Sequence, residues 1–490
     1  MEFSTILHNI LQLLAFDPTN PMLFSSGLFW VLFLVFLPIY AMLKHRRTQM
    51  MVFVLAFSLY FYYKSSGWFL LLLVATSLCD WIFSHLIARS VSAVRRRALM
   101  IVSICLSLSV LGYFKYANFF LWNLSALVAG NFQPLDIILP VGISFYTFQS
   151  VSYVVDVYKR RIEPTRTWLE YAFYLAFFPG LVAGPIVRAD YFLPQLRDNR
   201  PATRSVVYAG LWLVIVGIIK KAIIADYIAQ YNDLIFNNPS GYSGVETIMA
   251  IVGYTMQIYC DFSGYSDMAI GIAAILGFNL PDNFRLPYQS KNVTEFWRRW
   301  HISLSSWLRD YIYIPLGGNR RGKVRTYVNN LLTMLIGGLW HGAAWKFVFW
   351  GGMHGAGLML HKFLRPWLDL IPDTRLVRMA SWAVTMIFVS LLWVFFRADS
   401  FTDATLIIGN AFSRIDASHL LPFIKERYLW CIMMVVIISF HAMPLHWLER
   451  ASQWFVGTHW LTKLLIFMAV VQLTLQFLTA DVKPFIYFQF

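Results

Sequence analysis

The chain has 490 residues, of which 58% are hydrophobic, 18% aromatic and only 13% charged. Because an ordinary soluble protein is about 25% charged, this composition excludes a soluble globular fold and predicts an all-α polytopic membrane protein. The formal net charge is +15, but the basic residues lie in short loops between apolar runs, where they orient helices and meet anionic lipid. We therefore expect contact with membrane lipid and no binding of nucleic acid. No long polar segment separates a soluble domain, so residues 1–490 are predicted to form a single membrane domain.

The cysteines and the missing motifs narrow the possible functions. All four cysteines lie inside apolar runs and none forms a CxxC pair, so neither a zinc site nor a disulfide framework is indicated and no metal is predicted. The chain has no GxSxG, P-loop, HExxH or GxGxxG signature. Hydrolase, ATPase, metalloprotease and dehydrogenase functions therefore lose their usual support.

The first third of the chain predicts membrane spans separated by basic clusters. Residues 1–24 are weakly amphipathic and end in two proline-containing pairs, which predicts an interfacial helix followed by a turn. Five spans follow at about 28–43, 50–66, 68–88, 98–116 and 135–158. Counting these spans puts the basic clusters at 44–47, 89–97 and 159–161 on one side, which the positive-inside rule makes cytoplasmic. The N-terminus is then predicted to lie outside.

The rest of the chain adds a broken helix, a polar middle and further spans. Residues 171–188 are apolar but interrupted by Pro-Gly and Gly-Pro pairs, as in helices buried in protein or lining a cavity. Residues 278–326 are too polar to span, and their arginine and aromatic content predicts short helices at the interface. Spans are predicted near 206–224, 245–277, 328–345, 347–363, 378–396, 428–446 and 460–479. The total is expected to be nine to twelve.

The stretch 257–355 holds ionisable residues inside apolar sequence, and we therefore predict that it contains the site. His341 lies among glycines that allow a ligand or another backbone to approach, and desolvation there favours the neutral imidazole that a general base requires. A structural hydrogen bond to a neighbouring helix is the alternative. His301 is less sharply indicated, as a catalytic group, a substrate contact or an interfacial residue. Asp261 and Asp267 do not share a helix face, so we expect a structural ion pair with an arginine rather than an acid–base couple.

A basic surface flanks His301 in the sequence. It consists of Arg298, Arg299, Arg309, Arg320 and Arg321, which suit the phosphates of a nucleotide cofactor or of lipid equally well. His354 and His361 are expected to be structural.

Three long motifs in this stretch resemble the membrane-bound O-acyltransferase (MBOAT) family. They are DFSGYSDMAIG, EFWRRWHISLSSWLRDYIYIPLGGNR and GGLWHGAAWKFVFWGGMHG, supported by GYFKYANFF, LPVGISFYTFQSVSYVVDVY and FFPGLVAGPIVR earlier in the chain. The resemblance covers about residues 20–490 and is strongest to the bacterial branch that O-acetylates polysaccharides such as alginate. It implies about 9–12 transmembrane helices with re-entrant or interfacial helices around a central funnel or tunnel.

The resemblance also implies roles for individual residues. The active-site histidine of the family falls on His341, and the second histidine of the bacterial branch falls on His301. The ending 483–490 is similar to an aromatic motif of the teichoic-acid D-alanylation system, which makes Tyr487 a candidate acyl relay; an aromatic anchor at the interface is the alternative. Acyl-donor binding is expected from a set of six residues: Arg298, Arg299, Arg309, Trp300, Trp340 and Asn319.

The function that the resemblance implies is O-acetylation of an extracytoplasmic glycan, such as an exopolysaccharide or peptidoglycan, from cytoplasmic acetyl-CoA at the bacterial inner membrane. A separate esterase-like periplasmic subunit is expected as partner, because no fused soluble transferase domain can be read in the chain. One alternative is an acyltransferase for a carrier-loaded D-alanyl, lipid or protein substrate. Another class is a proton-coupled transporter or flippase whose buried Asp and His residues form a proton path.

Overall fold

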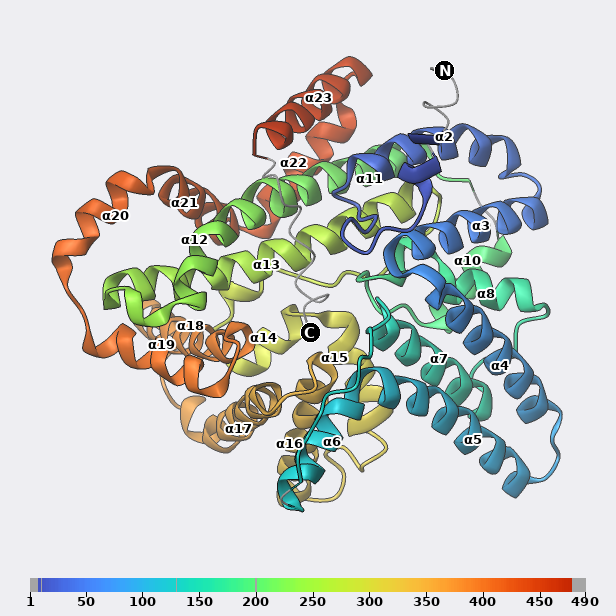
Figure 1. Ribbon diagram of the computed structural model, residues 1–490, viewed down its shortest axis with the longest axis horizontal. Helices are drawn as coiled ribbons and strands as arrows, with labels where there is room; N and C mark the ends of the chain where they lie inside the picture. Colours follow the sequence, from blue (N-terminus) through green and yellow to red (C-terminus); the bar gives the residue numbers. More distant parts are fainter. Residues whose placement is uncertain (1–7, 10, 129, 199–200, 478–490) are drawn as a thin grey trace. The chain divides into compact units, whose positions relative to one another are not determined.

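The computed structural model describes residues 8–9, 11–128, 130–198 and 201–477, and in this part of the chain every regular element is a helix (Figure 1). The chain divides into two compact units. Unit 1 contains Met1–Leu211 with Met268–Leu280, and unit 2 contains Trp212–Asp267 with Pro281–Phe490. The described residues thus form the all-helical architecture that the composition predicts.

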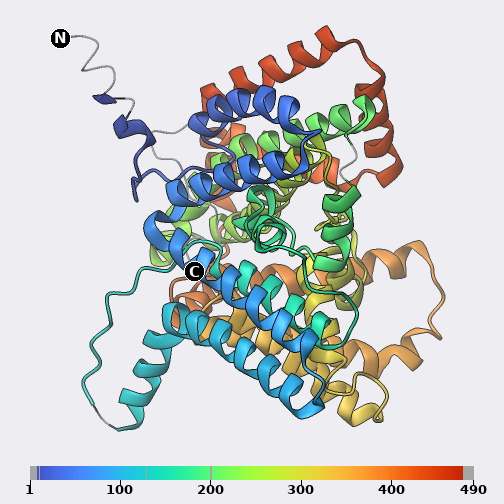
Figure 2. The same ribbon diagram turned by 90° about the vertical axis from the view of Figure 1, so that its right-hand side faces the viewer.

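Unit 1 is built from the helices before residue 200. They are α2 (Gly27–Leu43), α3 (Arg47–Ser66), α4 (Leu70–Arg89), α5 (Ala93–Leu111), α6 (Ala117–Leu127), α7 (Ile143–Tyr158), α8 (Trp168–Ala176), α9 (Phe178–Leu181) and α10 (Ala189–Asp198). Helices α4, α5 and α7 pack side by side (Figures 1 and 2). The predicted break in 171–188 is confirmed, because α8 ends at Ala176 and no regular helix follows α9 before residue 189.

One predicted span in unit 1 begins too early. The sequence predicts a helix from Leu135, but α7 starts at Ile143, and residues 131–140 are not helical. Pro134 and Pro140 disfavour helical backbone in the residues before them. Gly142 adopts φ +73°, which only glycine takes readily. An added Cβ there would lie 2.6 Å from the Leu181 carbonyl oxygen.

The first helices of unit 2 form one long helical run and a second long helix. Helix α11 (Arg204–Ile218) enters the unit, continues through the π-helix η3 (Ile219–Ala225), and ends with α12 (Asp226–Asn237). The predicted end of this helix near residue 224 is therefore wrong. Lys221 does not mark a loop, because it is buried and neutralised by acidic partners. Helix α13 (Gly244–Ile275) agrees with the predicted span at 245–277.

The remaining helices of unit 2 are the short ones of the polar middle and the longer ones that follow it in the chain. The short helices predicted in 278–326 are present as η5 (Pro287–Gln289), α14 (Val293–Arg299), α15 (Ile302–Leu308) and η6 (Arg309–Tyr313). Longer helices follow: α16 (Lys323–His341), α17 (Trp345–Leu368), α18 (Arg375–Arg397), α19 (Phe401–Ser413), α20 (Leu420–Glu426), α21 (Tyr428–Ala442), α22 (Leu445–Gly457) and α23 (Trp460–Phe477).

Within the described residues, five helices are long and apolar enough to cross a membrane, or six if the bent pair α21–α22 is counted as one span. This count is lower than the nine to twelve spans expected from the sequence. The difference arises in part because α2 is only 17 residues long, and because the two spans predicted at 50–66 and 68–88 are counted together as one helical run, Arg47–Arg89, of 43 residues.

Candidate active site

His301 is held in a strained backbone conformation between two short helices. It follows the end of α14, precedes α15, and has φ 43° and ψ 54°. This left-handed conformation is costly for a residue with a side chain and persists only where the surroundings determine it. Asn283 supplies that restraint, because its backbone oxygen accepts a hydrogen bond from the Ile302 N–H at 3.0 Å. The imidazole is fully buried.

The same asparagine fixes the protonation pattern of the His301 ring. The Oδ1 atom of Asn283 accepts hydrogen bonds from the Ser303 N–H at 3.3 Å and the Ser303 hydroxyl at 2.9 Å, and it lies 3.1 Å from His301 Nδ1. A backbone N–H can only donate, so the atom facing it is the amide oxygen. His301 Nδ1 must then be the donor of the third bond. The neutral ring therefore keeps its lone pair on Nε2.

His341 is the last residue of α16 and lies close to His301. Its side chain is buried, and its ring centroid is 6.4 Å from that of His301. The rings of Trp350 and Phe396 lie roughly perpendicular to the His341 ring, at centroid-to-centroid distances of 5.1 and 5.4 Å. Trp340 contacts both imidazoles, at 5.0 Å from His341 and 5.9 Å from His301. The two histidines predicted from the sequence thus lie in one buried cluster of aromatic rings, which we call the aromatic chamber.

Burial determines the protonation state of His301. It lowers the pKa of His301 to about 3, because the charged imidazolium is poorly solvated there. The ring of Phe262 packs edge-on against His301 at 4.7 Å and Phe284 stacks at 6.5 Å, so apolar atoms replace water around it. His301 is therefore neutral at physiological pH, and it can accept a proton or a hydrogen bond through Nε2.

Glycines bring the backbone of α17 against that of α16 beside His341. A Cβ added to Gly338 would lie 2.3 Å from the Phe347 carbonyl oxygen, and one added to Gly351 would lie 2.3 Å from the Met334 carbonyl oxygen. The two helices run antiparallel through this contact. The close approach expected around His341 is confirmed, with a neighbouring backbone as the partner, and it sets where α16 ends and therefore where His341 points.

The buried aspartates pair with lysines of η3. Asp261 lies 2.6 Å from Lys221 Nζ, which also contacts Asp226 at 2.7 Å, and Asp267 lies 2.7 Å from Lys220 Nζ. The expected ion pairing is present, but the cation is lysine in both pairs, where an arginine was predicted. Both lysines lie in the π-helix η3, where they face α13. The residue types alone do not reveal this orientation.

The predicted donor-binding residues separate into two environments. Arg298, Arg309 and Asn319 are exposed, as are Arg320 and Arg321 of the same basic surface. The Arg309 guanidinium donates to Asp310, which raises the pKa of Arg309. Arg299 is half-buried and pairs with Glu295 at 2.6 Å. In contrast, Trp300 and Trp340 are buried, and Trp340 belongs to the aromatic chamber.

Two other histidines make structural contacts. His354 is buried and accepts a hydrogen bond from the Trp297 indole N–H at 3.3 Å. His361 Nδ1 lies 2.9 Å from the Thr294 hydroxyl. These contacts connect α17 to α14, in keeping with the structural role expected for both residues.

Three residues of the site, Asn283, Ser303 and Trp350, were not predicted from the sequence. Asn283 stands in the Pro281-Asp282-Asn283-Phe284 loop, where a polar residue looks like an ordinary turn former, and its role appears only when α15 folds back onto it. Tyr487 lies outside the described residues. Among those that the structure describes, no group of three His, Cys, Asp or Glu side chains gathers as a metal site would.

Comparisons with known proteins identify the family of the chain. The family model described as the membrane-bound O-acyltransferase family matches residues 167–398, which include both histidines and Asn283. The chain is 36% identical over 494 residues to the probable alginate O-acetylase AlgI of Pseudomonas putida, covering 96% of this chain and all of that protein. It is 40% identical over 398 residues to the probable alginate O-acetylase AlgI of Azotobacter vinelandii, covering 80% and 78%. It is also 33% identical over 427 residues to the peptidoglycan O-acetyltransferase of Helicobacter pylori, covering 78% and 81%.

Proposed function

The chain belongs to the membrane-bound O-acyltransferase family and is therefore an acyltransferase, and from this premise we propose that it moves an acetyl group from cytoplasmic acetyl-CoA to hydroxyls of an extracytoplasmic glycan. The names of the relatives support the acceptor class, since they describe O-acetylation of alginate and of peptidoglycan. The protein would act in the bacterial inner membrane with its N-terminus outside. The transporter alternative is not retained, because the family identifies an enzyme.

The observation that carries this proposal is the pair of buried imidazoles in one aromatic chamber. An acyl transfer from a thioester needs a base that is neutral before the reaction and a site that keeps water from the thioester. His301 and His341 lie 6.4 Å apart between ring centroids, and both are shielded by aromatic rings. Reacting atoms held between them would meet a proton acceptor and an orienting group at once.

The chemical step follows from these positions. His341 takes the proton of the acceptor hydroxyl while the hydroxyl oxygen attacks the carbonyl carbon of the thioester. The tetrahedral intermediate then collapses, the carbon–sulfur bond breaks, and the CoA sulfur receives the proton from His341. His301 accepts a hydrogen bond through Nε2 from an amide N–H of the donor, because Asn283 commits its Nδ1 proton elsewhere. His301 thereby orients the thioester toward His341.

Donor and acceptor would reach the chamber from opposite faces of the membrane. The exposed arginines Arg298, Arg309, Arg320 and Arg321 suit the phosphates of CoA on the cytoplasmic side. Tyr487 is proposed as the first acceptor, from which a periplasmic esterase-like subunit would pass the acetyl group to the glycan. Trp340 would line the path of the acyl end, since it touches both imidazoles.

Turnover of labelled acetyl-CoA by purified protein in nanodiscs tests the proposal. Wild type, His341→Ala, His301→Ala and Tyr487→Phe are compared by CoA release and by intact mass, with and without a periplasmic extract and glycan. We expect CoA release by wild type and its loss in His341→Ala. An acetylated wild-type species that is absent in Tyr487→Phe supports the relay.

The outcomes separate the parts of the proposal. Acetylated protein in Tyr487→Phe would remove the relay but keep the acetyltransferase. Turnover of D-alanyl carrier in place of acetyl-CoA would replace the donor. No CoA release by any form, even with extract and glycan present, would refute acetyl-CoA-dependent transfer.

A further inference from the structure

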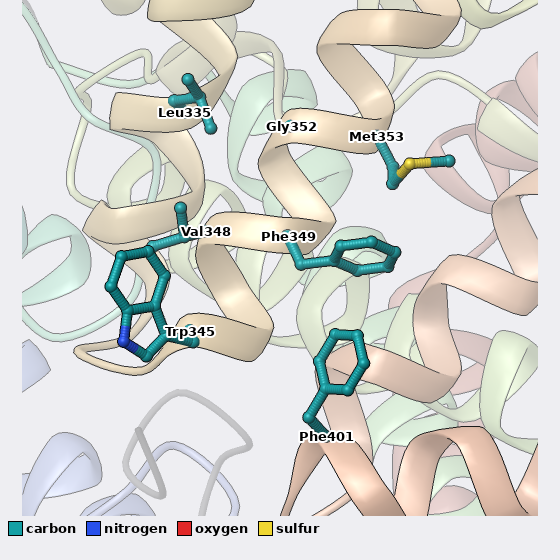
Figure 3. A pocket seen from close by; sticks show the side chains of 7 residues that line it. All are labelled: Leu335, Trp345, Val348, Phe349, Gly352, Met353 and Phe401. Atoms are coloured by element: carbon teal, nitrogen blue, oxygen red, sulfur yellow. The ribbon is translucent and has the colours of Figure 1, made fainter.

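Two cavities in unit 2 differ in the chemistry of their linings. The first has a volume of about 370 Å³ and is surrounded by side chains of α16, α17 and α19, including Val348, Phe349 and Phe401 (Figure 3). Its side chains are almost entirely apolar, so nothing in it selects one occupant over another. The second has a volume of about 750 Å³ and is lined by α13, η5, α18, α19 and α21. We call this second cavity the α18 groove.

One face of α18 forms the length of the groove. Met379, Trp382 and Met386 follow one another at helical spacing, so their side chains lie in a row. The lining stretch of α18 runs from Arg375 to Leu391, about 24 Å at 1.5 Å per residue. This helix is also one of the described helices that can cross a membrane. The groove is therefore long enough to follow a hydrocarbon chain through one leaflet, which is about 15 Å deep.

Three cations line this apolar groove, and two of them stand at one end of its α18 face. Arg375 and Arg378 stand in the first turn of α18, and Lys291 lines the same cavity from the loop after η5. Among the described residues that line the groove, none is acidic. Asp373 lies 3.2 Å from Arg378, but this pair is solvent-exposed and such pairs contribute little. The N-terminal end of α18 adds its own positive dipole to the three side chains.

The combination of an apolar groove and a cationic end identifies an amphiphile. Trp382 lies one turn beyond Arg378 and donates its indole N–H to the Tyr288 carbonyl oxygen at 2.8 Å. Tryptophan at the edge of an apolar segment marks the membrane–water interface, so the cations stand at headgroup level and the groove below them lies in the hydrocarbon. A free phosphate would leave the apolar lining uncovered. A peptide would need hydrogen-bond partners for its whole backbone, and the mainly apolar lining supplies few.

We infer that the α18 groove is a binding site for a phospholipid with a net negative headgroup. The phosphate and headgroup contact Arg375, Arg378 and Lys291, and an acyl chain lies along Met379, Trp382 and Met386. The site is separate from the acyl-transfer chemistry and does not depend on the identity of the glycan or of the donor.

Photo-crosslinking tests the inference with a defined probe. Wild-type protein is reconstituted in nanodiscs that contain phosphatidylglycerol or phosphatidylcholine carrying a diazirine in the acyl chain, and the labelled peptides are identified by mass spectrometry. Native mass spectrometry measures how many lipids of each kind are retained. The charge variant is Arg375→Gln with Arg378→Gln. Its matched control is Arg95→Gln with Arg97→Gln, which removes two exposed arginines of α5 outside the groove.

We expect phosphatidylglycerol to label peptides of α18 and α13. Its retention should exceed that of phosphatidylcholine by roughly a hundredfold, since three basic side chains near a membrane surface contribute on the order of 1 kcal/mol each and about 1.4 kcal/mol is tenfold. The charge variant should lose this preference, and the control variant should keep it. Equal retention of the two lipids, unchanged preference in the charge variant, or labelling spread evenly over all spans would overturn the inference. So would displacement of the lipid by acetyl-CoA, which would assign the groove to the donor.

Discussion

Replacing Asn283 tests whether one side chain positions the reactive face of His301. The Asn283 side chain accepts from His301 Nδ1 and from the Ser303 N–H and hydroxyl, and its Nδ2 donates to the Ser266 hydroxyl at 3.1 Å. In Asn283→Ala each buried donor loses this acceptor, at about 1–3 kcal/mol per group. His301 is also free to adopt the other tautomer. We expect kcat/KM for acetyl-CoA turnover to fall about 10–100-fold, which is less than the full effect of a general base.

The variant Asn283→Asp separates positioning from stability. A carboxylate still accepts from His301 and Ser303, so the tautomer is preserved, and its charge raises the pKa of His301. Activity should be recovered in large part, and the acidic limb of the kcat/KM profile should move to higher pH. Ser266→Ala serves as the matched control, because it removes one hydrogen bond of Asn283 without touching His301. Its activity should stay near wild type.

The refuting result is specific. If Asn283→Ala melts earlier in detergent but keeps wild-type kcat/KM, Asn283 is a structural residue and the assigned tautomer has no catalytic consequence. If Asn283→Asp is as inactive as Asn283→Ala and shows no shift in its pH profile, the argument from the Nδ1 hydrogen bond fails.

Three further predictions concern stability, measured as thermal unfolding in detergent. Burial lowers the pKa of His301 from 6.5 to about 3, so the unfolded state binds more protons than the folded state between these pH values. His301 should therefore lower the free energy of unfolding by up to about 1.4 kcal/mol for each pH unit below pH 6.5. The fall should be shallower in His301→Gln, and parallel curves for the two proteins would contradict the assignment. Lys221→Met leaves Asp261 buried without its lysine and should cost about 3–5 kcal/mol, whereas adding Asp261→Asn should restore part of the loss. Gly351→Ala forces a Cβ against a carbonyl oxygen and should destabilise by at least about 1–3 kcal/mol; Gly409→Ala, where nothing lies within 4 Å, should not.

Periodicity and apolar length were enough to predict most helices, because a bilayer requires long apolar segments whose ends are marked by charges and prolines. The run 50–88 and the helix at 245–277 show this directly. Two predicted helix ends were wrong. At Leu135 the apolar composition predicted a helix although nearby prolines prevent one, and near residue 224 two lysines predicted a loop where the helix continues. In the second case Asp226 follows Lys221 in the same helical run, but the second acid, Asp261, stands on another helix, so the local sequence could not reveal that Lys221 is buried.

The site was predictable in part for a similar reason. His341 stood out because an ionisable residue in apolar sequence is costly, whereas His301 was indicated mainly by the resemblance to the family. The structure brings the two together. Asn283 did not stand out, since asparagine after proline and aspartate is usual in a turn. Its importance comes from the left-handed backbone of His301, a tertiary feature that no pattern of residue types announces.

The buried lysine–aspartate pairs also constrain how the chain can enter the membrane during synthesis. Lys220 and Lys221 are made before Asp261 and Asp267. Lys221 already has Asp226 in its own helical run, but a helix that presented Lys220 alone to lipid would face a cost of roughly 2.5–3.5 kcal/mol. That cost falls when α13 arrives with Asp267. We therefore expect the run ending in α12 and helix α13 to enter the bilayer together, as a single unit of insertion.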